Sequence, residues 1–358
     1  MLHKIDWYII KKFLGTFFYA IALIISISIV FDVSENIDDF MSKDVPLKAI
    51  VFDYYLNFIP YFANLFSGLF TFIAVIYFTS KLAYNTEIIA ILSSGVSFNR
   101  LMRPYMVGAA VIALFSYLLG NYVIPPANKK KVEFRNTYIG TRKVGTANNI
   151  HQQIEPGIFV YMQSYNASND VGYKFTIEHF VDRKLVSKLS AEYIKWDREK
   201  KKWVIHEYSV RTISGYTEKI THGIEKDTLL NMIPQDYEVV DNIVETMTLP
   251  MLNESIASLK LRGVNTTEYE IEKHKRRSGP FSAFILTIIG VSLASKKIKG
   301  GIGFHLGLGL LLSFSYILFM QVTTVFATSD MLAPWVAMWI PNVLYGGLAF
   351  YLYRRASA

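Results

Sequence analysis

Long apolar runs stand at both ends of the chain, and a polar middle separates them. Five runs approach or exceed the ~20 residues that cross a bilayer as a helix, and a shorter sixth is bounded by basic residues. The runs cover residues 13–31, 54–77, 105–124, 280–294, 302–326 and 335–353. This pattern predicts six transmembrane helices, three before the polar middle and three after it.

Composition places the chain among polytopic membrane proteins. Its 358 residues are 52% hydrophobic and only 18% charged, which is too apolar for a soluble protein. There is no cysteine, so disulfides, zinc–thiolate sites, iron–sulfur clusters and cysteine nucleophiles are excluded. The net charge of +8 arises from lysines and arginines beside the apolar runs and in one long loop. That placement suits lipid headgroups and membrane topology better than nucleic acid.

The charges that flank the first apolar run predict the orientation. Lysines precede the run and acidic residues follow it: Lys4, Lys11, Lys12, Asp32, Glu35, Asp38 and Asp39. By the positive-inside rule the N-terminus lies in the cytoplasm, so the polar middle lies outside and the C-terminus inside. The run is longer than the apolar region of a signal peptide and no cleavage site follows it, so we expect a retained span.

Two spans carry residues that shape helix packing. Pro60 is expected to kink the second span, while Asn57 and Asn64 satisfy freed backbone groups or pair with a neighbouring helix. Small residues gather at the start of the fifth span: Gly301, Gly303, Gly307 and Gly309. Their spacing predicts close approach of another helix.

The segment 85–104 is the main polar interruption between the second and third spans. Apolar side chains recur there at helical spacing at Ile88, Ile91 and Leu92. Thr86 is expected to cap this short helix, Gly95 to end it and Ser97 to cap the next one. The residues alone leave two interpretations open: an ordinary cytoplasmic loop, or a coupling helix that docks on a soluble partner and passes its motion to the spans.

The polar middle, residues 127–278, is predicted to form an all-β domain. Apolar and polar side chains alternate as in strands at residues 157–166, 173–181, 191–197 and 202–213. The sequence Asp-Arg-Glu-Lys-Lys at 197–201 predicts a hairpin turn between the last two. Strands of this kind suggest a β-sandwich or a jellyroll-like sheet.

The domain is expected to begin and end with helices. Pro125 and Pro126 should end the third span, and a basic helix at 128–138 continues it as a stalk. Helical pieces at 253–261 and 266–277 lead back to the membrane. The predicted domains are residues 1–126 with a coupling helix near 86–101, the β-domain 127–278, and residues 279–358.

The search for catalytic chemistry is largely negative. The chain has no G-x-x-x-x-G-K-[ST] phosphate loop, so we expect it not to hydrolyse ATP by itself. It has no H-E-x-x-H motif or other metal-ligand spacing, and no acidic residue inside the spans to support ion-coupled transport. We therefore predict no catalytic residue, no metal site and no cofactor in this chain.

Several motifs in a fixed order carry a resemblance to a known family. They are F-I-P-Y-F in span two, E-x-x-A-x-x-x-S-G at 87–95, R-L-M-R-P at 100–104, H-K-R-R-x-x-P at 274–280, G-G-I-G-F-H-L-G at 300–307 and W-I-P-N at 339–342. With this order the chain resembles the lipopolysaccharide-export permeases LptF and LptG (the YjgP/YjgQ family) over essentially its whole length. The pattern is more similar to LptG.

The resemblance implies an architecture and a set of partners. The expected fold is an α-helical polytopic membrane protein of six transmembrane helices with an inserted periplasmic β-jellyroll domain, in the bacterial inner membrane. In the family, one LptF and one LptG enclose a cavity open to the outer leaflet above an LptB ATPase dimer. ATP bound by LptB closes the cavity and expels lipopolysaccharide along the jellyrolls towards a bridge that begins with LptC.

The resemblance also implies site residues. The match to the coupling helix points to ATPase contacts at Glu87, Ile91, Leu92, Gly95 and Arg100. LptG-type relatives can have lysines at the outer end of span one, where this chain has acidic residues. Other cations are therefore expected to meet lipid phosphates: Lys43, Lys129, Lys130, Lys131, Arg135, Arg276 and Arg277. Divalent cations bridging the acidic residues to phosphate are the alternative.

Two functions from other classes stay open. A mechanotransmitting ABC subunit couples ATP to periplasmic work without carrying lipid, but it is expected to have four spans in another order. A membrane enzyme acting on lipid-linked sugars should have acidic residues and histidines clustered near the outer ends of the spans. The acidic segment 32–39 is the nearest candidate, and it has no matching histidine or metal pattern.

Overall fold

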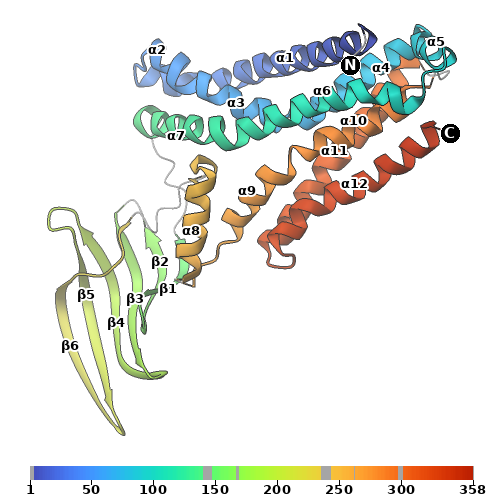
Figure 1. The fold of residues 1–358 in the computed structure, drawn as a ribbon. Helices are drawn as coiled ribbons and strands as arrows, with labels where there is room; N and C mark the ends of the chain where they lie inside the picture. Colours follow the sequence, from blue (N-terminus) through green and yellow to red (C-terminus); the bar gives the residue numbers. More distant parts are fainter. Residues whose placement is uncertain are drawn as a thin grey trace. The chain divides into compact units, whose positions relative to one another are not determined.

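The computed structural model describes residues 4–139, 147–166, 169–234, 243–261, 263–296 and 301–357. The chain divides into two compact units (Figure 1). The first comprises Met1–Ile139, Val244–Leu252 and Thr267–Ala358, and the second comprises Gly140–Ile243 and Asn253–Thr266. The first unit is helical and the second is built on a sheet, which confirms an all-β element inserted into a helical membrane protein.

The helices before the sheet are α1 (Lys4–Ser42), α2 (Leu47–Ala49), α3 (Leu56–Leu65), α4 (Ser67–Tyr84), α5 (Glu87–Ser93), α6 (Phe98–Leu118) and α7 (Ile124–Phe134). Those after it are α8 (Leu249–Leu261), α9 (Thr267–Ser278), α10 (Phe281–Ala294), α11 (Gly301–Thr328) and α12 (Pro334–Ser357). Among the described residues, five helices are long and apolar enough to cross a membrane, or six if the bent pair α9 and α10 counts as one span.

The second span is built differently from the prediction. Pro60 lies inside α3, and the chain breaks later, at Phe66, where φ −90° and ψ −2° separate α3 from α4. The amide roles are confirmed. Asn57 donates to the carbonyl oxygens of Phe52 and Asp53 at 3.0 and 2.9 Å, and Asn64 accepts a 2.6 Å hydrogen bond from Ser116 of α6.

The expected end of the third span is wrong. Pro125 and Pro126 do not end the helix but stand in the first turn of α7, after a π-helical segment at Leu119–Val123. Proline is tolerated there because the first N–H groups of a helix have no intrahelical acceptor. The chain therefore stays helical from Phe98 to Ile139, which confirms the predicted stalk.

Helix α4 lies at the centre of the first unit, against α1, α10 and α11. Its Phe72, Val75 and Ile76 are at most 1% exposed. A Cβ at Gly309 of α11 would collide with Ile76, whereas Cβ atoms at Gly303 and Gly307 would meet nothing within 4 Å. The predicted close helix approach is thus confirmed at Gly309, whereas Gly303 and Gly307 meet no other helix of this chain; the side-chain surroundings of Gly301 lie outside the described residues.

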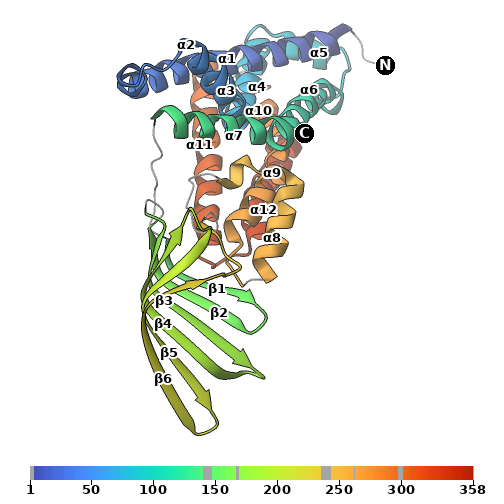
Figure 2. The ribbon, with the colours of Figure 1, turned by 90° about the vertical axis from the view of Figure 1, so that its left-hand side faces the viewer.

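The second unit contains one six-stranded antiparallel sheet whose strands follow one another in chain order (Figure 2). The strands are β1 (Ala147–Glu155), β2 (Ile158–Asn166), β3 (Val171–Val181), β4 (Lys184–Asp197), β5 (Lys202–Ser214) and β6 (Thr217–Thr228). No second sheet packs on it among the described residues. The all-β prediction is confirmed in the form of a single meandering sheet.

The sheet buries one apolar face. Trp203, Phe175, Met162 and Ile194 are completely buried in it. The predicted hairpin turn is confirmed, because the Oδ1 atom of Asp197 accepts the backbone N–H groups of Glu199 and Lys200 at 2.9 and 3.0 Å. Strands β1 and β6 were not predicted. Strand β6 has no buried side chain, and its pairing with β5 along the whole strand defines it.

Candidate functional site

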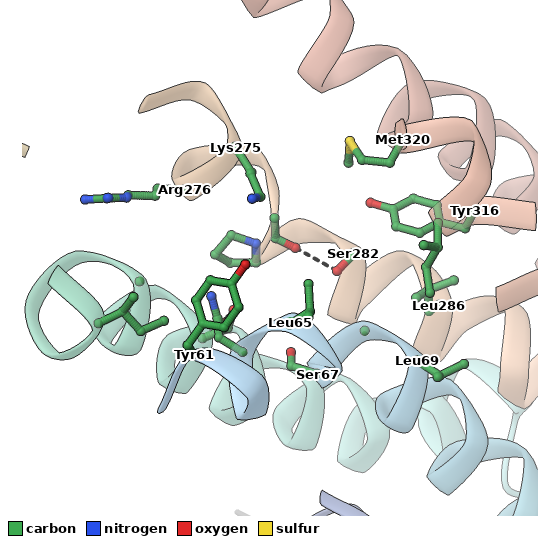
Figure 3. Close-up of a pocket in the computed structure, with 18 of the residues that line it drawn as sticks. Tyr61, Leu65, Ser67, Leu69, Lys275, Arg276, Ser282, Leu286, Tyr316 and Met320 are labelled. Carbon is green, nitrogen blue, oxygen red and sulfur yellow. Dashed lines mark hydrogen bonds between the residues drawn. The ribbon is translucent and has the colours of Figure 1, made fainter. Parts of the chain in front are cut away.

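A cavity of about 270 Å³ lies inside the first unit, between α3 and α4 on one side and α9, α10 and α11 on the other (Figure 3). Its apolar walls come from the membrane helices and comprise Leu65, Leu69, Leu286, Ile317 and Met320. The hydroxyl groups of Ser67, Ser282 and Tyr316 also line it. The cavity can therefore hold part of an amphipathic molecule, with apolar atoms against the leucines and polar atoms beside the hydroxyl groups.

The bend between α9 and α10 shapes one wall of this cavity. The two helices meet at 47° across Gly279 and Pro280, which both line the cavity. The break frees backbone carbonyl groups, and Ser282 donates to the Gly279 carbonyl oxygen at 2.7 Å (Figure 3). Asn342 of α12 donates to the Ser278 carbonyl oxygen at 2.9 Å and accepts from the Tyr316 hydroxyl at 2.8 Å.

Charged side chains gather at the polar end of the cavity. Arg276 is buried there: its Nε donates to Glu272 at 2.7 Å and its Nη1 to the Met247 carbonyl oxygen at 2.7 Å. Its hydrogen bonds are thus made within the protein. Lys275 is half exposed, with its Nζ 3.7 Å from Glu272. Of these two cations, Lys275 is the one that can reach a ligand.

Glu245 completes this polar end. Its carboxylate accepts hydrogen bonds from the Tyr61 hydroxyl at 3.5 Å and from Asn128 at 3.4 Å. Burial raises the pKa of Glu245 above its ordinary value, and the nearby Lys275 and Lys131 oppose that rise. The acidic Glu245 and Glu272 offset part of the positive charge of the nearby lysines and Arg276, so the end of the cavity is polar without being strongly cationic.

The cations predicted to meet phosphates lie in several places. Lys131 lies over the Tyr61 ring at 5.1 Å, near Glu245 and therefore near the cavity. Lys43 donates to the Ile139 carbonyl oxygen and lies 3.9 Å from Asp39. Of the other five cations, Lys129, Lys130, Arg135 and Arg277 are exposed and do not line the cavity, whereas Arg276 is buried at its polar end.

Three charged cavity residues were not selected from the sequence. Lys275 belongs to the H-K-R-R motif, and its half-exposed side chain beside the buried Arg276 distinguishes it only in three dimensions. Glu245 and Glu272 come from separate segments that the fold brings together. No local signal pointed to them. Among the described residues, no group of three or more histidine or acidic side chains is placed to hold a metal ion.

The short helix α5 connects α4 to α6 as expected from the sequence. The N-terminus of α5 differs from the prediction. Thr86 has φ +62° and makes no side-chain cap hydrogen bond, so the predicted Thr86 cap is wrong. A left-handed residue turns the chain here instead. The Ser97 cap of α6 is confirmed, since its hydroxyl accepts the Arg100 backbone N–H at 3.3 Å. Gly95, at φ +86°, follows the end of α5.

The faces of α5 differ in exposure. Ile88 is completely buried and Ile91 is partly buried against the same core. Leu92 and Ile89 are exposed, and Glu87 is intermediate. Ile91 and Arg100 also line a groove of about 460 Å³ with Asp6 of α1. Of the five predicted contact residues, Glu87, Leu92 and Gly95 are the ones accessible on α5 and its turn, whereas Ile91 and Arg100 face the groove.

The chain thus combines membrane-spanning helices around a part-polar cavity with a short surface helix between two spans and an inserted sheet. The chain belongs to the lipopolysaccharide export system permease LptF/LptG family, whose model matches residues 7–355. This match confirms the resemblance carried by the motifs, and it does not separate LptF from LptG. Comparison with curated proteins finds no match.

Proposed function

We propose that this chain is a permease subunit of an ABC transporter that extracts lipopolysaccharide from the outer leaflet of the inner membrane and passes it to a periplasmic bridge. The family match over residues 7–355 carries this proposal. We further propose that both termini are cytoplasmic and that the sheet unit is periplasmic, as the basic segment before the first span and the acidic one after it favour.

The cavity supports this substrate class by its chemistry. Acyl chains are stabilised by apolar walls such as Leu69 and Ile317, because every buried CH₂ group contributes about 0.8 kcal/mol. A lipid phosphate can pair with the half-exposed Lys275, while Glu272 and Arg276 hold the surrounding backbone in place. We propose that Lys131 and Lys275 meet the phosphates first and that the exposed Lys129 and Lys130 extend this set.

ATP hydrolysis is assigned to separate chains. We propose that an LptB-like ATPase dimer docks on α5, that a second LptF/LptG-type permease completes the complex, and that an LptC-like protein receives the lipid. The exposed Leu92 and Ile89 and the partly exposed Glu87 provide an apolar and acidic contact surface on α5. This chain then needs no cofactor of its own.

The first test is purification of the chain from detergent-solubilised native membranes. We expect a soluble ATPase and a second multi-span permease to accompany it, and Leu92→Asp to remove the ATPase. Asn99→Asp, which places the same charge on the exposed first turn of α6, is the control and should retain it. A single chain without ATPase activity, under conditions that preserve other ABC complexes, contradicts the proposal.

The second test concerns the lipid. A photocrosslinking residue introduced at Leu69 or Ile317 should crosslink to lipopolysaccharide, and Lys275→Gln should reduce that yield. The control is a crosslinker at Leu114, which is 59% exposed on α6 and lies outside the cavity lining. Equal yields at all three positions would show that the cavity has no preference for this lipid.

A further inference from the structure

The first turns of α1 and α6 are joined by a buried ion pair. Nη1 and Nη2 of Arg100 each donate to one carboxylate oxygen of Asp6, both at 2.7 Å. The Asp6 side chain is 4% exposed and that of Arg100 is 27% exposed. Two parallel hydrogen bonds hold the planes of the two groups against each other, so the pair sets orientation as well as distance.

Arg100 is connected to α5 by a short turn. Its backbone N–H is held by the Ser97 cap, and the turn that leads back to α5 passes through Gly95. Ile91 of α5 lines the same groove as Asp6 and Arg100. The beginning of α1 lies beside α5 and α6 in both ribbon views (Figures 1 and 2). A displacement of α5 therefore reaches Asp6 through two connected groups.

Helix α1 packs unevenly along its length. Phe13 and Phe17 are completely buried in the first half, but no residue from 22 to 39 is buried. The second half of α1 is attached through another carboxylate: Asp32 accepts hydrogen bonds from the hydroxyl groups of Tyr54 and Tyr55 at 3.2 and 3.0 Å. The first half of α1 is thus packed on α4 and α6, whereas Asp32 holds the second half through these two hydrogen bonds.

We propose that the Asp6–Arg100 ion pair transmits displacement of α5 to α1, and that both are positioning residues for transport. The inference rests on the proposed docking of an ATPase on α5. It gives Arg100 a different role from direct ATPase contact, since its guanidinium is engaged with Asp6. Removing one partner leaves a buried charge unpaired and lets α5 move in the groove without α1.

The test uses the complex purified from native membranes and reconstituted in lipid. Asp6→Asn, Arg100→Gln and the double variant are compared for lipopolysaccharide released per ATP hydrolysed. We expect each single variant to lower this ratio about 5-fold or more while hydrolysis continues. The double variant should be no worse than either single one, because interacting residues are non-additive.

A distance measurement separates transmission from a merely structural role. The chain has no cysteine, so Val30→Cys on α1 and Val343→Cys on α12 can be spin-labelled selectively in this chain. Both positions are exposed. Trapping the ATPase with a nucleotide analogue should change the distance between the two spin labels in the otherwise unaltered chain. Asp6→Asn should abolish that change.

A control at Arg103 and a second variant at Arg100 test whether the effect depends on the ion pair itself. Arg103→Gln, on the exposed face one turn further along α6, should leave the ratio unchanged. If Asp6→Asn prevents assembly, Arg100→Lys decides, since it keeps the charge and loses the paired hydrogen bonds. An unchanged ratio and distance change in Arg100→Lys overturn this inference alone. An unaltered chain that binds no ATPase overturns the proposed function and this inference with it.

Discussion

Helices α1 and α4 are both apolar, yet their surroundings differ. In the most apolar 18-residue stretch of each, 67% of α4 is buried within the chain and only 17% of α1. Helix α1 is the more apolar of the two by sequence. Apolar content therefore indicates that a helix resides in the membrane, but not whether other helices of the chain or something outside the chain cover it.

The largest difference in the effect of a mutation on stability is expected between two phenylalanines, one in each helix. Phe72 of α4 is completely buried and Phe31 of α1 is 72% exposed. Phe72→Ala should lower the free energy of unfolding by about 3–5 kcal/mol, because it leaves a cavity in the core. Phe31→Ala should change it by less than about 0.5 kcal/mol. Thermal unfolding of the detergent-purified chain measures both, and equal effects would contradict the contrast between the helices.

Two glycines of α11 test how closely α11 packs on α4. Gly309→Val pushes a side chain into Ile76 and should destabilise the chain by about 1–3 kcal/mol. Gly307→Val is the matched control, since its Cβ meets nothing within 4 Å. The same unfolding assay applies. A destabilising Gly307→Val with a neutral Gly309→Val would show that α11 packs on α4 through another face.

Asn342 tests whether polar contacts also stabilise the buried set of helices. Asn342→Leu leaves the Tyr316 hydroxyl and the Ser278 carbonyl oxygen without this partner, at an expected cost of about 1–3 kcal/mol. Val343→Ala, at a neighbouring exposed position, is the control and should be near neutral. A neutral Asn342→Leu would mean that water or another group replaces the amide.

The smallest expected effect on folding stability is a pH dependence that arises from Glu245. Burial raises its folded-state pKa above the ordinary value of 4.5, so its contribution to stability is complete below that pH. The contribution is lost as pH rises through the higher folded-state pKa. Glu245→Gln should remove this loss, whereas the exposed Glu133→Gln should not. Unfolding temperatures from pH 4 to pH 8 measure the difference, and parallel curves for Glu245→Gln and the unaltered chain would contradict it.

Local patterns predicted most elements of the fold. The spans, the strands β2 to β5 and the turn at Asp197 follow from periodicity and turn chemistry. The errors have physical reasons. Pro125 and Pro126 occupy a first helical turn that tolerates them, and β6 is formed by hydrogen bonding to β5 rather than by its own side chains.

The candidate site was less accessible to sequence reasoning. The motif at 87–95 located α5, but the exposure of Leu92 and the partial burial of Ile91 depend on which face packs on the helical core. The link from Arg100 to Asp6 joins residues 94 positions apart in the chain. Glu245, Glu272 and Lys275 meet only because the chain returns to the helical unit after the sheet.

The amino-acid sequence alone was enough to identify a polytopic membrane protein with an inserted β-domain and a member of the LptF/LptG family. Hydrophobic period, turn residues and motif order are local properties, so they can be read without a structure. The three-dimensional arrangement was needed to show which apolar faces are buried, which cations already form hydrogen bonds within the chain, and where the cavity lies. Hydrocarbon and a neighbouring helix both stabilise an apolar side chain, so hydropathy cannot distinguish them, and only long-range contacts decide.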